Sequence, residues 1–496
     1  MSKSVNEEIE KKMDEIENAV VEQLIIDEEF HMEVEEILNI LIEKINSDLS
    51  SIGVIGRVEK QGSFVRRTYL NEDDTYDLVL ILKKDEKPNV PRILDLLVER
   101  LKNDRIQKQP IQITKIVGKL PYLRIIANGI LVNLFVGFDI SPEQSKMSIF
   151  DLIPLHTSYI ITHMSSNEKK DVLLLKKFMK SIGVYRNEIG AIGFNGYLCE
   201  LLILFYGSFR NTIKAIAKWK PRVLIDMKKN KQVIEDVDAQ TIELLGGYYP
   251  LYVSDPLAPR NNVAADVSIN QFNSVISAAN VYLYAPSLSF FLYQPVTLPS
   301  FETLVQKIKM SGKTILVLSF YRRHQESEIC WQQALNMKKA FTKELERNRY
   351  LIERIQPFIT DEYYGIFISL FKSKPQVTVR REGPSIFDGK ASANFLKTFS
   401  THVDVVSGPY IENQKWVIYF ANRGQDVILF LQSLVHSNTF ILEVDSFLKL
   451  EIKNKLKIHS VETTLKDLYN TDIEFAEQFY LFVERKPLWI LNIGKQ

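Results

Sequence analysis

The first fifty residues carry apolar positions at helical spacing. Over residues 6–49 the period is close to that of an α-helix, with a break near the sequence IDEEF. The apolar stripe consists of Leu24, Ile25, Val34, Ile37, Leu38, Leu41 and Ile45. Such a stripe on an otherwise acidic helix is typical of a surface helix that packs one face on a core. We therefore expect an interrupted helix lying on the sheet that follows it.

From residue 53 the pattern changes to that of strands. The runs GVIGRVEKQGS and YDLVLIL precede an expected helix at 92–102, and YLRIIANGILVNLFVGF then holds two apolar runs joined by Asn128-Gly129. An Asn-Gly pair between apolar runs favours a hairpin, because both turn positions need positive φ. Residues 1–145 are accordingly predicted to form an α/β domain with a small mixed sheet.

The rest of the chain divides into a helical and a mixed part. Residues 146–250 are mostly helical in pattern, and the Pro/Asn-rich stretch 254–266 predicts a loop. Beyond 310 the strand-like runs TILVLSF, YYGIFISLF, KWVIYFA and FILEVDSF alternate with helices. The predicted fold class is α+β with several domains.

Composition excludes few classes of protein, but it gives some indication of the compartment and of the kind of partner. The 496 residues are 46% hydrophobic and 25% charged, with 62 basic and 61 acidic side chains. No stretch approaches the roughly 18 apolar residues of a membrane span. Cys199 and Cys330 lack metal-ligand spacing, which favours a reducing cytoplasm. Basic clusters at KKDVLLLKKFMK, KAIAKWKPR and FKSKPQVTVRR suit a partner that touches one face, such as a nucleic acid, although composition alone favours solvated helix faces and loops.

Candidate chemistry gathers in residues 62–82, GSFVRRTYLNEDDTYDLVLIL. Alternate strand residues share a face, so Thr75, Asp77, Val79 and Ile81 point to one side of the predicted strand. A Gly-Ser turn shortly before it can offer backbone N–H groups and a hydroxyl to phosphate oxygens. In nucleotidyl transfer, carboxylates on one such face hold metal ions and a third from a neighbouring strand completes a two-metal site.

This stretch resembles the Gly-Ser and acid-x-Asp signature of the polymerase β-like nucleotidyltransferases, and in particular the archaeal-type, class I tRNA CCA-adding enzymes. The segments PLHTSYI, DVLLLKKFMKSIGVY, GFNGYLCELLILFYGSF and SDPLAPRNNVAADVS follow that family's order and spacing. The resemblance implies a nucleotidyltransferase-like head (1–145), a helical neck (146–258) and an α+β body and tail (259–496). It implies tRNA or a tRNA-like RNA as partner, ATP and CTP as ligands, and Mg²⁺ as cofactor.

The resemblance also implies roles for particular residues. The positions that contact the nucleotide in the family correspond here to Gly62, Ser63, Arg66, His156, Lys176 and Tyr185. Arg380 and Arg381 are candidates for RNA phosphate contacts on the tail, with plain surface charge as the alternative.

The three metal-binding acids of the family are only partly present. Asp77 matches the second, but Thr75 stands at the first and Asn133 at the third. Mg²⁺ prefers anionic oxygens, and Thr and Asn supply neutral ones, so the site is about two negative charges short for two divalent ions. We therefore expect CCA addition to be absent or weak, with Mg²⁺ binding at Asp77 in doubt.

Other interpretations remain open on the sequence alone. A β-bulge could align Asp74 with Asp77 and give a rewired but active nucleotidyltransferase. A non-catalytic interaction scaffold needs no RNA. The chain could also act as a homodimer, or beside an active homologue.

Overall fold

The computed structural model describes residues 3–72, 75–116, 120–139, 147–185, 193–227, 232–234, 249–292, 297–322, 327–375, 378–421, 424–436, 446–486 and 490. The chain divides into two compact units, one running from the N-terminus to Gln294 and the other covering Pro295–Lys486. The predicted three-part division at 145 and 258 stays a prediction.

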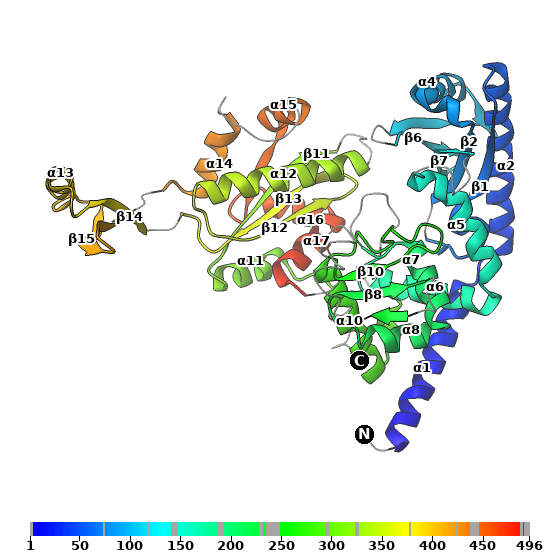
Figure 1. Ribbon diagram of the computed structural model, residues 1–496, viewed down its shortest axis with the longest axis horizontal. Coiled ribbons are helices and arrows are strands. Elements are labelled where there is room, and N and C mark those ends of the chain that lie inside the picture. The colour runs from blue at the N-terminus through cyan, green and yellow to red at the C-terminus, as the bar shows by residue number, and fades with distance from the viewer. Residues whose placement is uncertain are drawn as a thin grey trace. The chain divides into compact units, whose positions relative to one another are not determined.

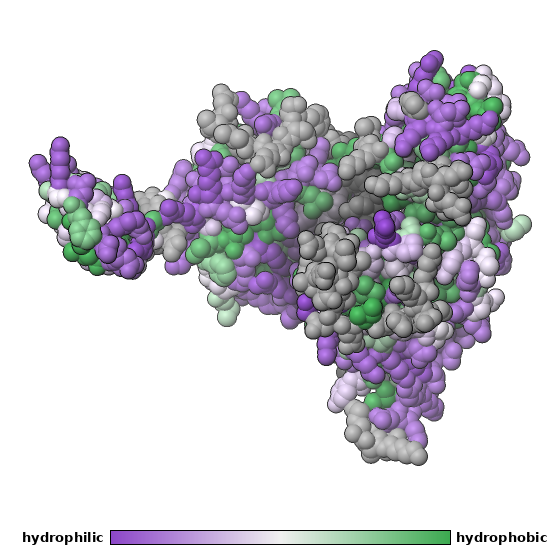
Figure 2. Space-filling view, in the orientation of Figure 1, coloured by the Kyte–Doolittle hydropathy of each residue, from purple (hydrophilic) through white to green (hydrophobic). Residues whose placement is uncertain are grey.

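Two long helices open the first unit, α1 (Lys3–Leu24) and α2 (Glu28–Ser51). The break between them is the one predicted near IDEEF. Asp27 begins α2, because its carboxylate accepts from the backbone N–H of Glu29 at 2.9 Å. Met13, Ile16 and Val20 of α1 are buried, whereas its outer side is largely hydrophilic (Figure 2).

A five-stranded sheet follows, in the order β1-β2-β7-β6-β5 (Figure 1). Strands β2 and β7 run parallel, and the other neighbouring pairs are antiparallel. The strands are β1 (Gly56–Gln61), β2 (Thr75–Leu82), β5 (Gln112–Ile116), β6 (Tyr122–Ala127) and β7 (Ile130–Phe138). Between them come α3 (Gly62–Arg66), η1 (Lys84–Asn89), α4 (Val90–Leu101), β3 (Arg105–Ile106) and β4 (Gln109–Pro110). The predicted hairpin is confirmed, with φ of 48° at Asn128 and 84° at Gly129.

The two faces of this sheet differ as the alternation in β2 predicts. Tyr76, Leu78, Leu80 and Leu82 join a large core with the apolar residues of α2 and α4. On the opposite face, Val79 and Ile81 belong to a smaller cluster with Tyr122, Phe135 and Phe150. The smaller cluster does not include the first residues of β2 on that face, Thr75 and Asp77, which are polar.

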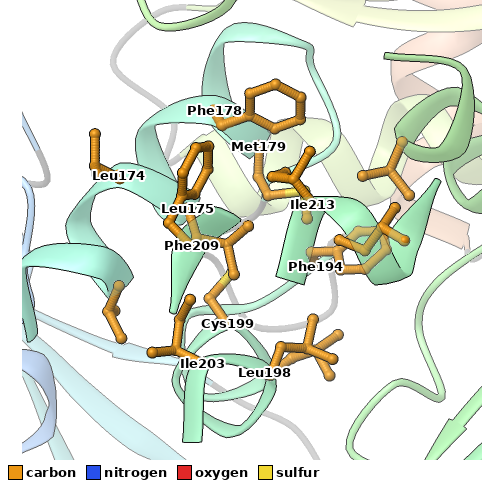
Figure 3. Close-up of a cluster of buried hydrophobic side chains, with 14 of the residues drawn as sticks. Leu174, Leu175, Phe178, Met179, Phe194, Leu198, Cys199, Ile203, Phe209 and Ile213 are labelled. Atoms are coloured by element: carbon orange, nitrogen blue, oxygen red, sulfur yellow. The ribbon is translucent and has the colours of Figure 1, made fainter. Parts of the chain in front are cut away.

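A helical region forms the rest of the first unit. Its helices are α5 (Ile149–His163), α6 (Ser166–Ser181), α7 (Gly196–Tyr206), α8 (Phe209–Ile216), α10 (Ile269–Tyr284) and η2 (Leu288–Phe290). Three short strands accompany them, β8 (Val223–Asp226), β9 (Gln232–Ile234) and β10 (Leu251–Val253). Capping boxes with Ser148, Ser165 and Ser268 begin α5, α6 and α10. Figure 3 shows the core of this region, where apolar side chains of α6, α7 and α8 surround Cys199.

The second unit contains two antiparallel sheets. One has the order β12-β13-β11-β17 and the other β14-β16-β15. The strands are β11 (Thr314–Tyr321), β12 (Ile352–Ile359), β13 (Tyr363–Leu370), β14 (Thr378–Ser385), β15 (Val405–Glu412), β16 (Lys415–Ala421) and β17 (Lys457–Ser460). The helices are α11 (Phe301–Met310), α12 (Ser327–Arg347), α13 (Gly389–Phe399), α14 (Val427–His436), α15 (Ser446–Lys455), α16 (Leu465–Thr471) and α17 (Ile473–Glu484).

Three of the four strands predicted beyond residue 310 are confirmed, as β11, β13 and β16. The fourth, FILEVDSF, lies mostly outside the described residues, and its last two residues begin α15. In the described part of both units, no helix is long and apolar enough to cross a membrane.

Candidate functional site

The Gly-Ser turn lies directly against Asp77. Gly62 follows β1 with φ of +78°, and a Cβ at that position would lie 2.5 Å from Asp77 Oδ2. The turn therefore needs glycine for its backbone conformation and also for space. The Gly62 N–H donates to Thr157 Oγ1 of α5 at 3.2 Å. The contact ties the turn to the helical region.

A polar row crosses the sheet at the level of Asp77. Gln61 on β1, Asp77 on β2, Asn133 on β7 and Arg124 on β6 are successive cross-strand partners. Cross-strand partners share a face, so these side chains are neighbours. Among the described residues, Gln61 Oε1 and Asn133 Oδ1 are buried without a hydrogen-bond partner.

Two of the three predicted metal positions are thus adjacent, and the third is on the same face. Asp77 pairs with Asn133, and Thr75 precedes Asp77 by two residues on β2, opposite Leu131. The strand register thus places the three predicted positions on one face of the sheet, with one carboxylate among them. Asp74, which a β-bulge was predicted to align with Asp77, lies outside the described residues.

Burial dominates the electrostatics of Asp77. It raises the pKa of this carboxyl to about 6, and Arg66 and a hydrogen bond from Asn133 offset only part of that effect. The carboxylate therefore has less stabilising charge around it than its burial requires.

Arg66 and Lys176 meet at a buried carboxylate that the sequence analysis missed. Glu200 of α7 accepts from Arg66 Nε at 2.9 Å and from the Thr68 hydroxyl, and Lys176 Nζ lies 3.8 Å from the same oxygen. Lys176 also donates to the Thr68 carbonyl at 2.6 Å. Glu200 is fully buried, yet Arg66, Lys176 and Thr68 outweigh its desolvation and hold its pKa below the usual range. The sequence does contain a signal for it, because a lone acid within the apolar run YLCELLILF has to be paired when buried.

His156 is held from the loop after β10. Its Nε2 lies 2.7 Å from Asp255 Oδ2, and its ring stacks on Tyr197 with centroids 4.0 Å apart. Burial opposes ionisation of Asp255, but the hydrogen bond from His156 brings the pKa of this carboxyl below its usual range. The ring therefore donates to a carboxylate. Neither Asp255 nor Tyr197 was singled out from the sequence.

Tyr185 lies close to Lys176 at the start of α7. A Cβ on Gly196 would be 3.2 Å from Lys176 Nζ and 3.3 Å from the Tyr185 hydroxyl. The side chain of Tyr185 packs against the core of the helical region. The ends of the Lys176 and Tyr185 side chains, both predicted from the sequence, therefore lie beside Gly196.

Ser63 is partly buried in the first turn of α3. In the first unit, the structure thus gathers Gly62, Ser63, Arg66 and Asp77 at the turn, with Thr157 joining the turn to the helix that also carries His156.

The two predicted RNA-binding arginines lie on β14 in the second unit. Arg380 pairs with Glu382 at 2.7 Å and with Glu412 at 3.1 Å. Arg381 lies over the ring of Phe399, 5.2 Å from its centroid. Arg380 thus already has acidic partners, while Arg381 makes a cation–π contact.

Within the described ranges, no group of three His, Cys, Asp or Glu side chains is arranged to hold a metal ion.

Comparison with known proteins identifies the class and then the family. Residues 170–292 match a family model described as the second domain of tRNA nucleotidyltransferase, and residues 311–451 match the C-terminal domain of the CCA-adding enzyme. The chain is 30% identical over 344 residues to the CCA-adding enzyme of Saccharolobus shibatae, covering 69% of this chain and 74% of that relative. It is 26% identical over 405 residues to the CCA-adding enzyme of Methanosarcina barkeri, covering 82% and 85%. The chain belongs to the CCA-adding enzyme family.

The resemblance drawn from the motifs to the CCA-adding enzymes is therefore confirmed, and the structure confirms the predicted α+β fold class with more than one compact unit. Among solved structures, a cytoplasmic RNA terminal U-transferase aligns with a TM-score of 0.45 and 13% identity, over 57% of this chain and 99% of that one.

Proposed function

We propose that this chain binds tRNA or a tRNA-like RNA together with a nucleoside triphosphate, and that its CCA addition is absent or weak. The observation that carries the proposal is the polar row on the sheet, where Asp77 pairs with Asn133 and Thr75 stands two residues before it on the same face.

The donor set of this row does not fit a pair of divalent cations. Asp77 supplies one anionic group, while Asn133 and Thr75 offer neutral oxygens. Mg²⁺ in nucleotide sites is usually held through one or two carboxylates and the phosphates of the substrate. Metal ions contribute several kcal/mol of transition-state stabilisation in such sites. A loss of roughly 4 kcal/mol corresponds to about a thousandfold in rate.

The nucleotide contacts are assigned to the turn and the helical region. Gly62 and Ser63 form the turn that would contact the nucleotide. His156 and Tyr185 are the same residue types that contact the nucleotide in the family. Arg66 and Lys176 are buried, and they are linked to the segment around the turn through Thr157 and Thr68. The RNA contacts, with Arg380 and Arg381 as candidates, belong to the second unit.

The proposal includes a cytoplasmic setting, and action as a homodimer or beside an active homologue. The support for the first is that Cys199 and Cys330 are both buried thiols.

Two measurements test the proposal. Purified protein is incubated with Mg²⁺, labelled CTP or ATP, and tRNA that lacks its CCA end, and we expect little or no incorporation. Robust incorporation would establish an active enzyme with a rearranged site, and its survival in Asp77→Ala would show that Asp77 is not part of that site.

Filter binding of tRNA over a salt series tests the RNA contacts. Phosphate contacts predict an affinity that falls steeply as salt rises. Absence of binding at low salt would favour the interaction scaffold.

A further inference from the structure

Glu200 joins three separate parts of the first unit. Its carboxylate lies on α7, Arg66 comes from α3, Lys176 from α6, and Thr68 from the segment after α3. The side chains of Glu200 and Lys176 are 0% and 1% exposed. The Glu200 carboxylate lies between the two buried basic side chains, and its negative charge offsets part of the cost of burying them.

The hydrogen bonds continue from Glu200 to the Gly-Ser turn. With Nε bound to Glu200, Arg66 turns its Nη1 to Thr157 Oγ1 at 3.2 Å. The same hydroxyl oxygen accepts from the Gly62 N–H and donates to the Ile153 carbonyl at 3.0 Å. Thr157 thus uses its one donor and both acceptor sites, which leaves one orientation for the hydroxyl. A continuous chain runs from Glu200 through Arg66 and Thr157 to Gly62.

We infer that Glu200 is a positioning residue for triphosphate recognition, which orients Arg66 and Lys176 and, through Thr157, sets the Gly62–Ser63 turn. This inference rests on the proposed nucleotide binding and adds a residue that touches no ligand. We expect its effect to fall mainly on phosphate binding, because the hydrogen bonds lead from Glu200 to the Gly62–Ser63 turn and to the two cations.

The selectivity of the effect distinguishes positioning from plain structural support. Affinities for ATP and for AMP are measured on folded wild-type protein and on Glu200→Gln, which keeps the shape and removes the charge. We expect ATP binding to weaken by at least about tenfold and AMP binding to change less than about twofold. Glu17→Gln is the matched control, since Glu17 is a partly buried carboxylate paired with Arg210 at 2.7 Å, and it should leave both affinities unchanged.

Thr157→Val provides a second variant in case Glu200→Gln does not fold. It removes the link between Arg66 and Gly62 while the Arg66–Glu200 pair stays. We again expect the affinity for ATP to fall more than the affinity for AMP. An equal loss of affinity for ATP and AMP, or no loss of affinity in either variant, would overturn the positioning role of Glu200. The proposed nucleotide binding would not be affected by that result. If wild-type protein binds no ATP, the proposed nucleotide binding fails, and the assignment of Glu200 fails with it.

Discussion

Two carboxylates of the first unit, the partly buried Asp77 and the fully buried Glu200, have opposite surroundings. Around Glu200 two cations and a hydroxyl converge on one oxygen, and the pKa of the carboxyl falls below its usual range. Around Asp77 the neighbours on the sheet are amides, and burial raises the pKa to about 6. Protein groups therefore balance the charge of the Glu200 carboxylate, whereas the Asp77 carboxylate has fewer groups around it to balance its charge.

The comparison shows what a buried acid needs. A buried carboxylate is stabilised in its ionised form when cations and hydrogen-bond donors replace its water, as they do at Glu200 Oε1. In an active two-metal site the metal ions themselves balance several acids. Under the proposed function Asp77 takes the position of such an acid, and the neighbouring Asn133 and Thr75 are neutral side chains that add no charge to attract the ions. Protein groups therefore balance the charge at Glu200, whereas the charge at Asp77 is not balanced in this way, which agrees with the proposed absent or weak CCA addition.

Restoring the acids should produce the largest effect. In Thr75→Asp/Asn133→Asp, three carboxylates share one face of the sheet, and Mg²⁺-dependent incorporation of CTP into tRNA lacking CCA should rise by about a hundred- to a thousandfold. Thr75→Asn is the neutral control. An unchanged rate in the double variant would mean that more than these two carboxylates separates this chain from an active enzyme.

Removing the carboxylate at the balanced site should give the largest loss of stability. Glu200→Ala leaves Arg66 and Lys176 buried without their shared partner, a change that typically costs about 3–5 kcal/mol. Urea unfolding measures it. Glu35→Ala provides the comparison, because its partner Lys60 is 25% exposed and the loss should stay below about 1 kcal/mol. Similar losses in both variants would contradict the assigned strength of the Glu200 cluster.

Asp77 should contribute to the pH dependence of the free energy of unfolding. Its folded pKa of about 6 exceeds the unfolded value near 3.8, so the folded state binds the proton more tightly. The resulting stability is fully present below the unfolded pKa and is lost as pH rises through the folded one, by on the order of 2 kcal/mol. Asp77→Asn should remove this part of the slope between pH 4 and 7 in urea unfolding. Asp139→Asn, at a carboxylate that is 72% exposed, should retain the slope of the wild type.

A smaller effect is expected at Arg210, a partly exposed counterpart of the Glu200 cluster. Arg210 binds Glu10, Asp14 and Glu17 of α1, and Arg210→Ala should cost about 1 kcal/mol because solvent still screens the pairs. Amide hydrogen exchange should quicken along α1. Lys214→Ala, which removes an exposed pair with Glu10, should change it little, and equal exchange in all three proteins would show that apolar contacts alone hold the helix.

Local features of the fold followed from the sequence. Alternation in residues 75–82 predicted which side chains face each side of the sheet, and the two clusters around β2 match it. The Asn128-Gly129 turn and the break before α2 were equally local. Within the candidate site, sequence reasoning proposed Asp77, Asn133 and Gly62 from the strand pattern and the resemblance, and register then brought them side by side.

By itself, the sequence determined the alternation, the turns and the residue types available for chemistry, because these depend on neighbours a few positions apart. Only the tertiary structure decided which charges meet. Glu200 reaches Arg66 across 134 positions and Asp255 reaches His156 across 99, and no periodicity encodes such pairs. A buried charge takes its partner from whatever element the packing brings beside it, so the balance of charge at Asp77 and Glu200 is a property of the folded chain.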